Sequence, residues 1–377
     1  MLGLYVHIPF CAQKCNYCDF NSYKIEEKNQ KQDYLISVAK EMELYNEEFK
    51  DKEFTSVFLG GGTPSILTPD ELTTLMKNIY SKFNIKKDAE ITMECNPGTL
   101  NKEKLKVIKS LGINRLSMGL QVTQNHHLKY IGRIHTYEQF EKNYKDAIDI
   151  GINNINVDLM YSLPNQSFDE WKETLEKIIN LNPKHISAYS LILEEGTKFY
   201  DMYMDKEFEL NDEEVDINIY NYTIDKLSSS GYNQYEISNY AKEGYECKHN
   251  ILYWKCDNYL GLGPGASGYI NNYRYSNICD ITEYNKYLDD NKKPLEEKNI
   301  LSKKDEIEEF IFMGLRMNKG INLDEFNKKF NINFKNKYNH IIEKLKNLNL
   351  IIEQNNNITL TQRGREISNT VFVEFID

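Results

Sequence analysis

Residues 5–20 read YVHIPFCAQKCNYCDF and join an apolar, β-branched run to three closely spaced cysteines, Cys11, Cys15 and Cys18. Three thiolates within eight residues can converge on one soft metal centre. Iron–sulfur clusters usually take four cysteines, so a [4Fe–4S] cluster held by these three would keep one iron free for a small molecule. A zinc knot completed by His7 or by a remote cysteine is the alternative interpretation of the same spacing.

Apolar runs of the same kind recur through the first half of the chain, with helix-period segments between them. The predicted strands are 4–8, 55–60, 89–95, 114–120, 154–160 and 185–191, and the predicted helices are 31–48, 69–83, 101–111, 137–150 and 168–180. This alternation indicates βα units and a parallel sheet covered on both faces. Each run ends in polar or glycine residues, which gather at one rim in a barrel. No GxGxxG follows the first run, so we predict an α/β fold, an open six-stranded barrel, without dinucleotide binding.

The remainder of the chain predicts a smaller second unit. A helix at 211–229 precedes a predicted loop at 247–269 and a charged, proline-containing linker at 289–299. Three helices and a hairpin then indicate a winged-helix-like α+β unit: helices 303–317, 322–330 and 335–348, strands 350–353 and 358–360, and a helix from Thr361. Its nearly balanced charge favours packing over nucleic-acid binding. The expected domains are 1–235, 236–300 and 301–377.

Composition excludes several classes of protein. The 57 acidic and 46 basic residues give a net charge of −11, which leaves no bulk basic character for holding polyanions. The sequence has no run of eighteen apolar residues, so it predicts no membrane-spanning helix, and its first residues lack the charged region of a signal peptide. The chain has an odd number of cysteines, seven, and we therefore expect them to be reduced thiols in the cytoplasm.

Several motifs together resemble the radical S-adenosylmethionine (SAM) superfamily. They are LYVHIPFC (4–11), GGGTPS (60–65), ECNP (94–97), RLSMGLQ (115–121), IGR (131–133) and NVDLMYSLP (156–164). The set is similar to the branch that contains oxygen-independent coproporphyrinogen III dehydrogenase and a group of heme chaperones. The likeness runs from Tyr5 to about Tyr269 and is weaker in the C-terminal unit. It implies a partial (βα)6 radical SAM barrel, a [4Fe–4S] cluster on the three cysteines, and bound SAM.

The resemblance also implies which residues form the SAM site. Tyr5, Gly61, Glu94 and Arg133 would contact SAM, and Tyr17, Gly62, Thr63, Gln121 and Asp158 match positions that line the same cavity and, in the dehydrogenase, a second SAM. An ionised Glu94 suits ribose hydroxyls as an acceptor. Arg133 offers a planar fork for the cofactor carboxylate. For each residue the alternative is an ordinary hydrogen-bonded polar group of the barrel.

Two departures separate this chain from the dehydrogenase. The dehydrogenase carries a further cysteine two residues beyond the triad, where this chain has Phe20. It also has an N-terminal extension, whereas this chain begins four residues before Tyr5. The resemblance therefore favours the heme-chaperone group over radical decarboxylation of coproporphyrinogen propionates, and another radical SAM enzyme is a more remote alternative.

The segment HNILYW (249–254) matches an H-N-x-x-Y-W pattern of the heme-chaperone group, to which heme binding is attributed. Imidazole is a standard axial ligand of heme iron, and aromatic rings can cover a porphyrin face. The predicted heme site is therefore His249, Tyr253 and Trp254; the alternative is a histidine that closes the barrel mouth beside core aromatics. The expected partners are heme and heme-accepting proteins, with peripheral membrane contact permitted and no nucleic acid.

Overall fold

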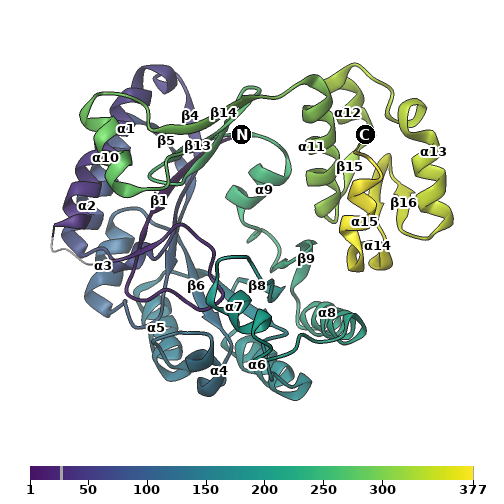
Figure 1. Ribbon diagram of the computed structural model, residues 1–377, viewed down its shortest axis with the longest axis horizontal. Helices are drawn as coiled ribbons and strands as arrows, with labels where there is room; N and C mark the ends of the chain where they lie inside the picture. The colour runs from purple at the N-terminus through teal and green to yellow at the C-terminus, as the bar shows by residue number, and fades with distance from the viewer. Residues whose placement is uncertain (26–28, 377) are drawn as a thin grey trace.

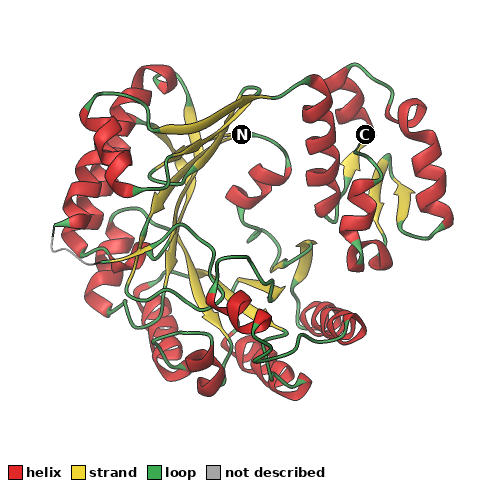
Figure 2. Ribbon diagram, in the orientation of Figure 1, coloured by secondary structure: helices red, strands yellow, loops and turns green. Residues whose placement is uncertain are grey.

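The computed structural model describes residues 1–25 and 29–376, and its centre is a twelve-stranded sheet (Figures 1 and 2). Six neighbouring strands of this sheet run parallel and in chain order, as predicted. They are β1 (Leu2–Ile8), β4 (Glu53–Gly61), β5 (Asn84–Cys95), β6 (Arg115–Gln121), β7 (Asn154–Tyr161) and β8 (His185–Ser190). The sheet curves into the wall of a partial barrel, which confirms the predicted fold class.

Helices cover the outer face of this wall (Figure 2). They are α1 (Gln30–Phe49), α2 (Pro69–Lys82), α3 (Lys102–Ser110), α5 (Tyr137–Ile150), α6 (Phe168–Leu181) and α8 (Glu213–Ser229), with the short helices η1 (Pro64–Ile66), α4 (Asn125–Tyr130) and α7 (Lys198–Met204) in the loops. Local sequence sets where they begin: Thr68, Thr136 and Ser167 each form a capping box. The apolar stripe of α6, Trp171, Leu175 and Ile178, is fully buried against the wall.

The sheet extends beyond the six predicted strands at both ends. Beside β8 lie the antiparallel strands β10 (Asn239–Ala241) and β9 (Asn233–Glu236). Beside β1 lie β11 (Asn258–Leu262), which is parallel to β1, and then the antiparallel strands β12 (Ser267–Ile270), β13 (Tyr273–Asn277) and β14 (Leu295–Ile300). Helix α10 (Ile281–Asp289) joins the last two, and β2 (Phe10–Cys11) pairs with β3 (Tyr23–Lys24) near the rim.

Two sequence predictions in this region were wrong. The stretch 247–269, predicted as a loop, holds helix α9 (Lys248–Trp254) and the strands β11 and β12. The stretch 289–299, predicted as a linker, contributes most of the edge strand β14. The physical reason is that β14 is charged and mostly exposed and β11 is short and contains Gly261, so neither shows the alternation of a half-buried strand.

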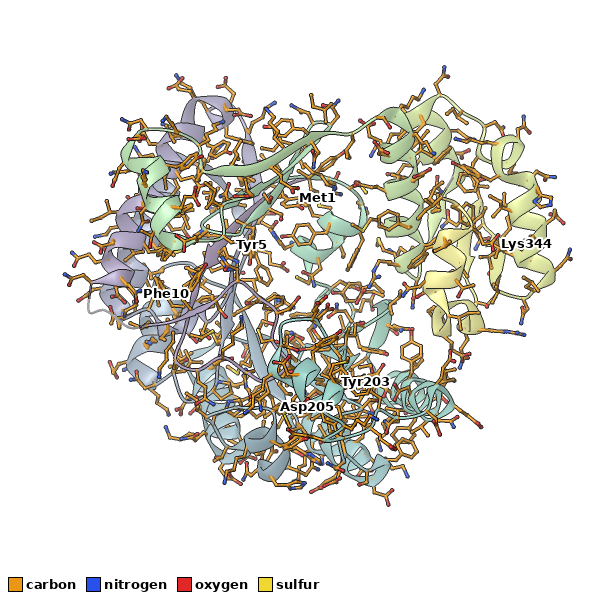
Figure 3. The ribbon with its side chains drawn as sticks, in the orientation of Figure 1. Met1, Tyr5, Phe10, Tyr203, Asp205 and Lys344 are labelled. Carbon is orange, nitrogen blue, oxygen red and sulfur yellow. The ribbon has the colours of Figure 1, made fainter. Side chains whose placement is uncertain are left out.

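The C-terminal unit has a separate apolar core. It consists of α11 (Lys303–Arg316), β15 (Ile321–Asn322), α12 (Leu323–Phe330), α13 (Phe334–Asn347), β16 (Ile351–Gln354), β17 (Asn357–Leu360), α14 (Gln362–Glu366) and α15 (Ser368–Val373). The predicted three helices and hairpin are confirmed, with β15 as an unpredicted third strand. Lys344 on α13 (Figure 3) forms an ion pair with Glu374, which follows α15, at 2.6 Å. Among the described residues, none of the helices has the length and apolar character of a membrane-spanning segment.

The C-terminal unit is fixed to the barrel by polar contacts. Arg274 of β13 forms a two-pronged ion pair with Glu309 of α11, at 2.7 and 2.6 Å. The backbone N–H of Asn318 donates to the carbonyl of Tyr235 at 2.9 Å. Helix α9 lies between the barrel wall and α11 (Figure 1).

Candidate functional site

A cavity of about 430 Å³ opens at the carboxyl ends of the parallel strands, where a barrel gathers its functional groups. Most of the predicted residues line it: Cys11, Cys15, Tyr17, Cys18, Gly61, Gly62, Thr63, Glu94, Gln121, Arg133 and Asp158. The predicted residues outside its lining are Tyr5, His249, Tyr253 and Trp254. The structure therefore brings the three cysteines together with every predicted SAM residue except Tyr5, and it places the predicted heme residues outside the lining of this cavity.

The cysteine loop is held at the rim by the segment that follows α4. The backbone N–H of Asn16 donates to the carbonyl of Ile131 at 3.0 Å, and its side-chain amide donates to the carbonyl of Tyr130 at 2.7 Å. The Cys11 Sγ lies 3.4 Å from the Thr63 hydroxyl, and the Cys15 Sγ accepts from Arg133 Nη1 at 3.5 Å. These contacts hold the loop beside the cavity that its three cysteines line.

The spacing of the thiols argues against a zinc knot. Ligands held about 2.3 Å from a single zinc ion would lie about 3.8 Å from one another. In the described part of the chain, the only group of three metal-ligand atoms within 4.8 Å of one another belongs to His126, His127 and Glu170, so the sulfurs are spread more widely. Nor is His7 free, because its ring nitrogens bond to the Tyr5 hydroxyl at 3.0 Å and the Asn21 carbonyl at 2.7 Å. Wider spacing fits the larger [4Fe–4S] cluster.

The glycine-rich edge presents bare backbone to the cavity. Gly61 has a φ of +108°, and a Cβ there would lie 2.7 Å from the His7 ring. A Cβ on Gly62 would lie 2.7 Å from the carbonyl oxygen of Phe10. These two positions therefore require glycine, and they let a ligand approach the backbone beside the cysteine loop.

Two carboxyl groups, Glu94 at the end of β5 and Asp158 within β7, face the same cavity. Burial and then the negative charge of Asp158 raise the pKa of Glu94 to about 8, against the N–H of Gly61 that donates to it at 3.1 Å. Burial also raises the pKa of Asp158, against hydrogen bonds from Asn156 at 2.7 Å and Ser117 at 3.1 Å. A cationic or hydroxyl-bearing ligand would relieve the repulsion between the two carboxylates.

Arg133 is the fixed cation of the cavity. Its Nη2 donates to Asn96 Oδ1 at 2.7 Å and to the carbonyl of Gly119. Its Nε is enclosed and has no hydrogen-bond partner among the described residues. An enclosed donor without a partner is costly, so this guanidinium suits an anionic group of a bound ligand. The carboxylates, the guanidinium and the bare backbone together fit the groups of SAM.

Some residues of the site escaped the sequence analysis. Asn96 links Thr63, to which it donates at 2.8 Å, with Arg133, and it belongs to the ECNP motif without having been assigned a role. The Tyr189 hydroxyl donates to Gln121 Oε1 at 3.1 Å, and Gln121 itself has a φ of +78°. Neither pairing has a signal in sequence, because each joins the ends of different strands.

Tyr5 lies behind the glycine edge instead of in the cavity. Burial, and then the charge of Glu94, raise its pKa well above the usual value. A Cβ at Gly60 would meet its ring at 3.0 Å. Tyr5 therefore supports the edge from behind in this conformation.

The HNILYW segment forms helix α9, and His249 within it is only 1% exposed. Its Nδ1 is hydrogen-bonded to the Ser56 hydroxyl at 2.8 Å and its Nε2 to the Tyr253 hydroxyl at 2.8 Å. Burial, followed by the positive charge of Arg115, lowers the pKa of His249 to about 3, so the ring is neutral.

The two ends of the motif face different surroundings. Asn250 is one of the residues that line the cavity. The ring centroid of Trp254 lies 4.7 Å from the guanidinium carbon of Arg316 in α11. Helix α9 thus connects the cavity with the C-terminal unit.

Comparison with known proteins agrees with this architecture. The chain matches the family model of the radical SAM superfamily over residues 5–178 and that of the HemN C-terminal domain over residues 301–367. Among solved structures, coproporphyrinogen III oxidase (HemN) from Escherichia coli, a radical SAM enzyme, is similar with a TM-score of 0.87, covering 100% of this chain and 90% of that one. At 23% sequence identity, this likeness shows the fold alone.

Curated relatives match along the full chain. The heme chaperone HemW of Lactococcus lactis subsp. lactis is 38% identical over 373 residues, which cover 99% of this chain and 96% of that protein. The heme chaperone HemW of Bacillus subtilis is 34% identical over 377 residues, which cover 100% and 99%. With this degree of identity over whole chains, and with the barrel and C-terminal unit both matched, the chain belongs to the HemW family of the radical SAM superfamily.

Proposed function

We propose that this protein is a heme chaperone that holds a [4Fe–4S] cluster and SAM at the barrel rim and delivers heme to heme-requiring proteins. The observation that carries the cofactor proposal is one cavity of about 430 Å³ lined by three free thiols, a bare glycine edge, two carboxyl groups and a guanidinium. Membership of the HemW family supports the heme proposal. Seven free thiols suit a reducing compartment, which supports a cytoplasmic location.

In the proposed site, Cys11, Cys15 and Cys18 hold the cluster and leave one coordination position for SAM. When bound, the cluster would supply an electron to the sulfonium of SAM. The chain's own residues bind SAM and orient it. Glu94 accepts from ribose hydroxyls, Arg133 pairs with the ligand carboxylate, and the backbone at Gly61 and Gly62 admits the ligand.

We place heme beside α9, on the family pattern of His249, Tyr253 and Trp254. A neutral imidazole is the form that ligates iron. Both ring nitrogens of His249 are hydrogen-bonded, so an iron ion must displace the Tyr253 hydroxyl or the Ser56 hydroxyl before it can bind. The proposal therefore requires α9 to shift when heme is loaded.

One residue that lines the cavity argues against the alternative function, that of coproporphyrinogen III dehydrogenase. Phe20 lines the cavity with its side chain 57% exposed, at the position where the resemblance implies a further cysteine in the dehydrogenase. An apolar ring offers neither a thiolate ligand nor a redox group there. We therefore expect no decarboxylation of coproporphyrinogen.

The deciding experiment is anaerobic reconstitution with iron and sulfide, followed by parallel assays. Heme binding is measured by absorption spectroscopy, and heme transfer by the appearance of holoprotein after mixing with an apo-heme protein. In a separate assay, coproporphyrinogen III is supplied with SAM and reductant, and its conversion to protoporphyrinogen is measured. Binding and transfer without porphyrinogen conversion supports the proposal. Absence of heme binding, or formation of protoporphyrinogen at enzymatic turnover, would replace it with the radical-enzyme alternative.

A further inference from the structure

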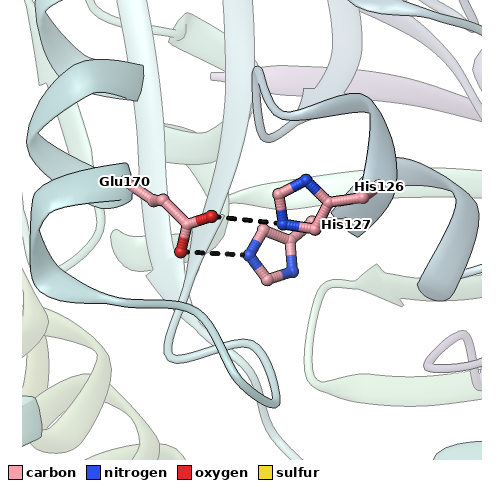
Figure 4. A group of neighbouring side chains, drawn as sticks. All are labelled: His126, His127 and Glu170. Atoms are coloured by element: carbon pink, nitrogen blue, oxygen red, sulfur yellow. Dashed lines mark ion pairs between the residues drawn. The ribbon is translucent and has the colours of Figure 1, made fainter.

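A second group of metal-ligating side chains lies outside the cavity, where α4 meets α6. His126 and His127 are neighbours on α4, and Glu170 lies in the first turn of α6 (Figure 4). One ligand atom from each lies within 4.8 Å of the others, and in the described part of the chain no other three His, Cys, Asp or Glu residues do so. None of the three residues belongs to the cluster, SAM or heme sites proposed above.

The distances match those between the ligands of a single ion. His126 Nε2 lies 3.1 Å from Glu170 Oε1, and His127 Nε2 lies 3.4 Å from Glu170 Oε2. Nitrogen and oxygen ligands placed about 2.0–2.2 Å from a tetrahedral zinc ion lie about 3.4 Å apart. The carboxylate faces both imidazoles at once, and the two rings lie with their centroids 4.1 Å apart.

The buried histidine supplies an independent indication. His127 is 3% exposed, and its enclosed Nε2 meets the geometry of no hydrogen bond with the described residues; it makes a 3.4 Å ion-pair contact with Glu170 Oε2 instead. A buried polar nitrogen normally has a partner, and an enclosed nitrogen without one needs a specific explanation. A cation placed between this nitrogen and the carboxylate would satisfy both.

The carboxylate is already oriented by its surroundings. Glu170 Oε2 accepts from the backbone N–H and from the hydroxyl of Ser167, each at 2.8 Å. The first of these bonds belongs to the capping box of α6, and both leave Oε1, which faces His126, as the freer oxygen. Hydrogen bonds to a ligating carboxylate of this kind fix its direction and strengthen metal sites.

We propose that His126, His127 and Glu170 form a site for a borderline divalent metal ion, zinc being the reference ion, with water completing the coordination. Two imidazoles and one carboxylate are a common protein donor set for zinc. The ion joins α4 to α6. Because the residues that end α4, Tyr130 and Ile131, hold Asn16 of the cysteine loop, the ion also stiffens the support of that loop.

The test uses the full-length protein with its cluster reconstituted, so that the cysteine triad is occupied. After equilibrium dialysis against zinc, bound zinc is measured by atomic emission in the wild type, His126→Ala, Glu170→Gln and His340→Ala. Glu170→Gln keeps an acceptor for the α6 cap, since Gln also serves at this position. His340→Ala removes another exposed histidine in the C-terminal unit and serves as the control.

We expect one zinc equivalent in the wild type and in His340→Ala. Affinity falls by more than about 100-fold in His126→Ala and Glu170→Gln, since loss of a direct ligand exceeds the effect of losing an outer partner. Cobalt(II) in place of zinc should give tetrahedral visible bands without sulfur charge transfer. Zinc should also raise the melting temperature of the wild type and not of His126→Ala. Zinc retention unchanged in both site variants, no retained zinc, or a cobalt–sulfur spectrum would overturn the proposal.

Discussion

The affinity for SAM is expected to rise with pH because the ligand-free cavity keeps Glu94 protonated. Burial and the charge of Asp158 raise the pKa of Glu94 to about 8. The sulfonium and ammonium groups of SAM favour the ionised carboxylate, so binding removes the proton. With this pKa, about 1% of Glu94 is ionised at pH 6 and about 9% at pH 7. The dissociation constant should therefore fall about ninefold from pH 6 to pH 7. This pH range lies below the pKa of an α-amino group, so titration of the amino group of SAM does not account for the change.

The assay is anaerobic titration calorimetry on the reconstituted protein, in buffers that differ in ionisation enthalpy. Proton release at pH 7 should approach about 0.9 per SAM bound. Glu94→Gln, which keeps an acceptor for the N–H of Gly61, should abolish both the release and the pH dependence. Asp158→Asn should move the dependence to lower pH, because it removes a charge that raises the pKa of Glu94. A flat affinity in the wild type, or the same slope in Glu94→Gln, would refute the reasoning.

Four further predictions test other parts of the molecule. Cys15→Ala should lose the [4Fe–4S] cluster, measured by iron, sulfide and electron paramagnetic resonance; stoichiometric zinc without iron in the wild type would contradict this. Gly62→Ala should lower the free energy of unfolding by roughly 1–3 kcal/mol and reduce cluster occupancy, because the added Cβ would lie 2.7 Å from the Phe10 carbonyl oxygen; an unchanged denaturation midpoint would count against this. Chromatography should find no conversion of coproporphyrinogen III. His249→Ala should change the heme absorption spectrum and weaken heme binding, and Trp254→Ala should weaken binding with less effect on ligation; an unchanged spectrum in His249→Ala would remove the heme from α9.

The barrel was predictable because its strands carry their own signals. The parallel strands β1 and β4 to β8 contain near-continuous apolar runs, and the helices α2, α5 and α6 begin at capping boxes that are visible in sequence. The edge strand β14 has no such signal, because it pairs with β13 on its backbone and exposes its charged side chains. Strand β15 is two residues long, too short for any pattern.

The site was predictable to the extent that motifs mark it. Three cysteines and a glycine run placed the cysteine loop and the edge beside it. The role of Asn96 required knowing that the ends of β4, β5 and β6 converge, since it links Thr63 with Arg133. The pair of His126 and His127 with Glu170 is also invisible in sequence, because Glu170 follows His127 by 43 positions in the chain.

The environment of His249 bears directly on how a heme carrier could work. A chaperone must release its cargo as well as bind it, so a histidine with no other partners would hold heme too firmly for transfer. In this structure the ring is hydrogen-bonded to Ser56 and Tyr253 and is almost wholly buried. Loading heme costs at least one of those two bonds, and releasing heme restores it.

The contacts of α9 extend this balance to the C-terminal unit. Trp254 lies against Arg316 of α11, and Asn250 reaches the SAM cavity from the same helix. A shift of α9 that frees His249 would therefore disturb both neighbours. By linkage, a ligand in the cavity or a partner on the C-terminal unit that favours the shifted helix would also favour heme binding, and one that favours the packed helix would favour release. The heme affinity of the protein should accordingly depend on whether SAM is bound, and equal heme affinity with and without SAM would show that α9 does not couple the two sites.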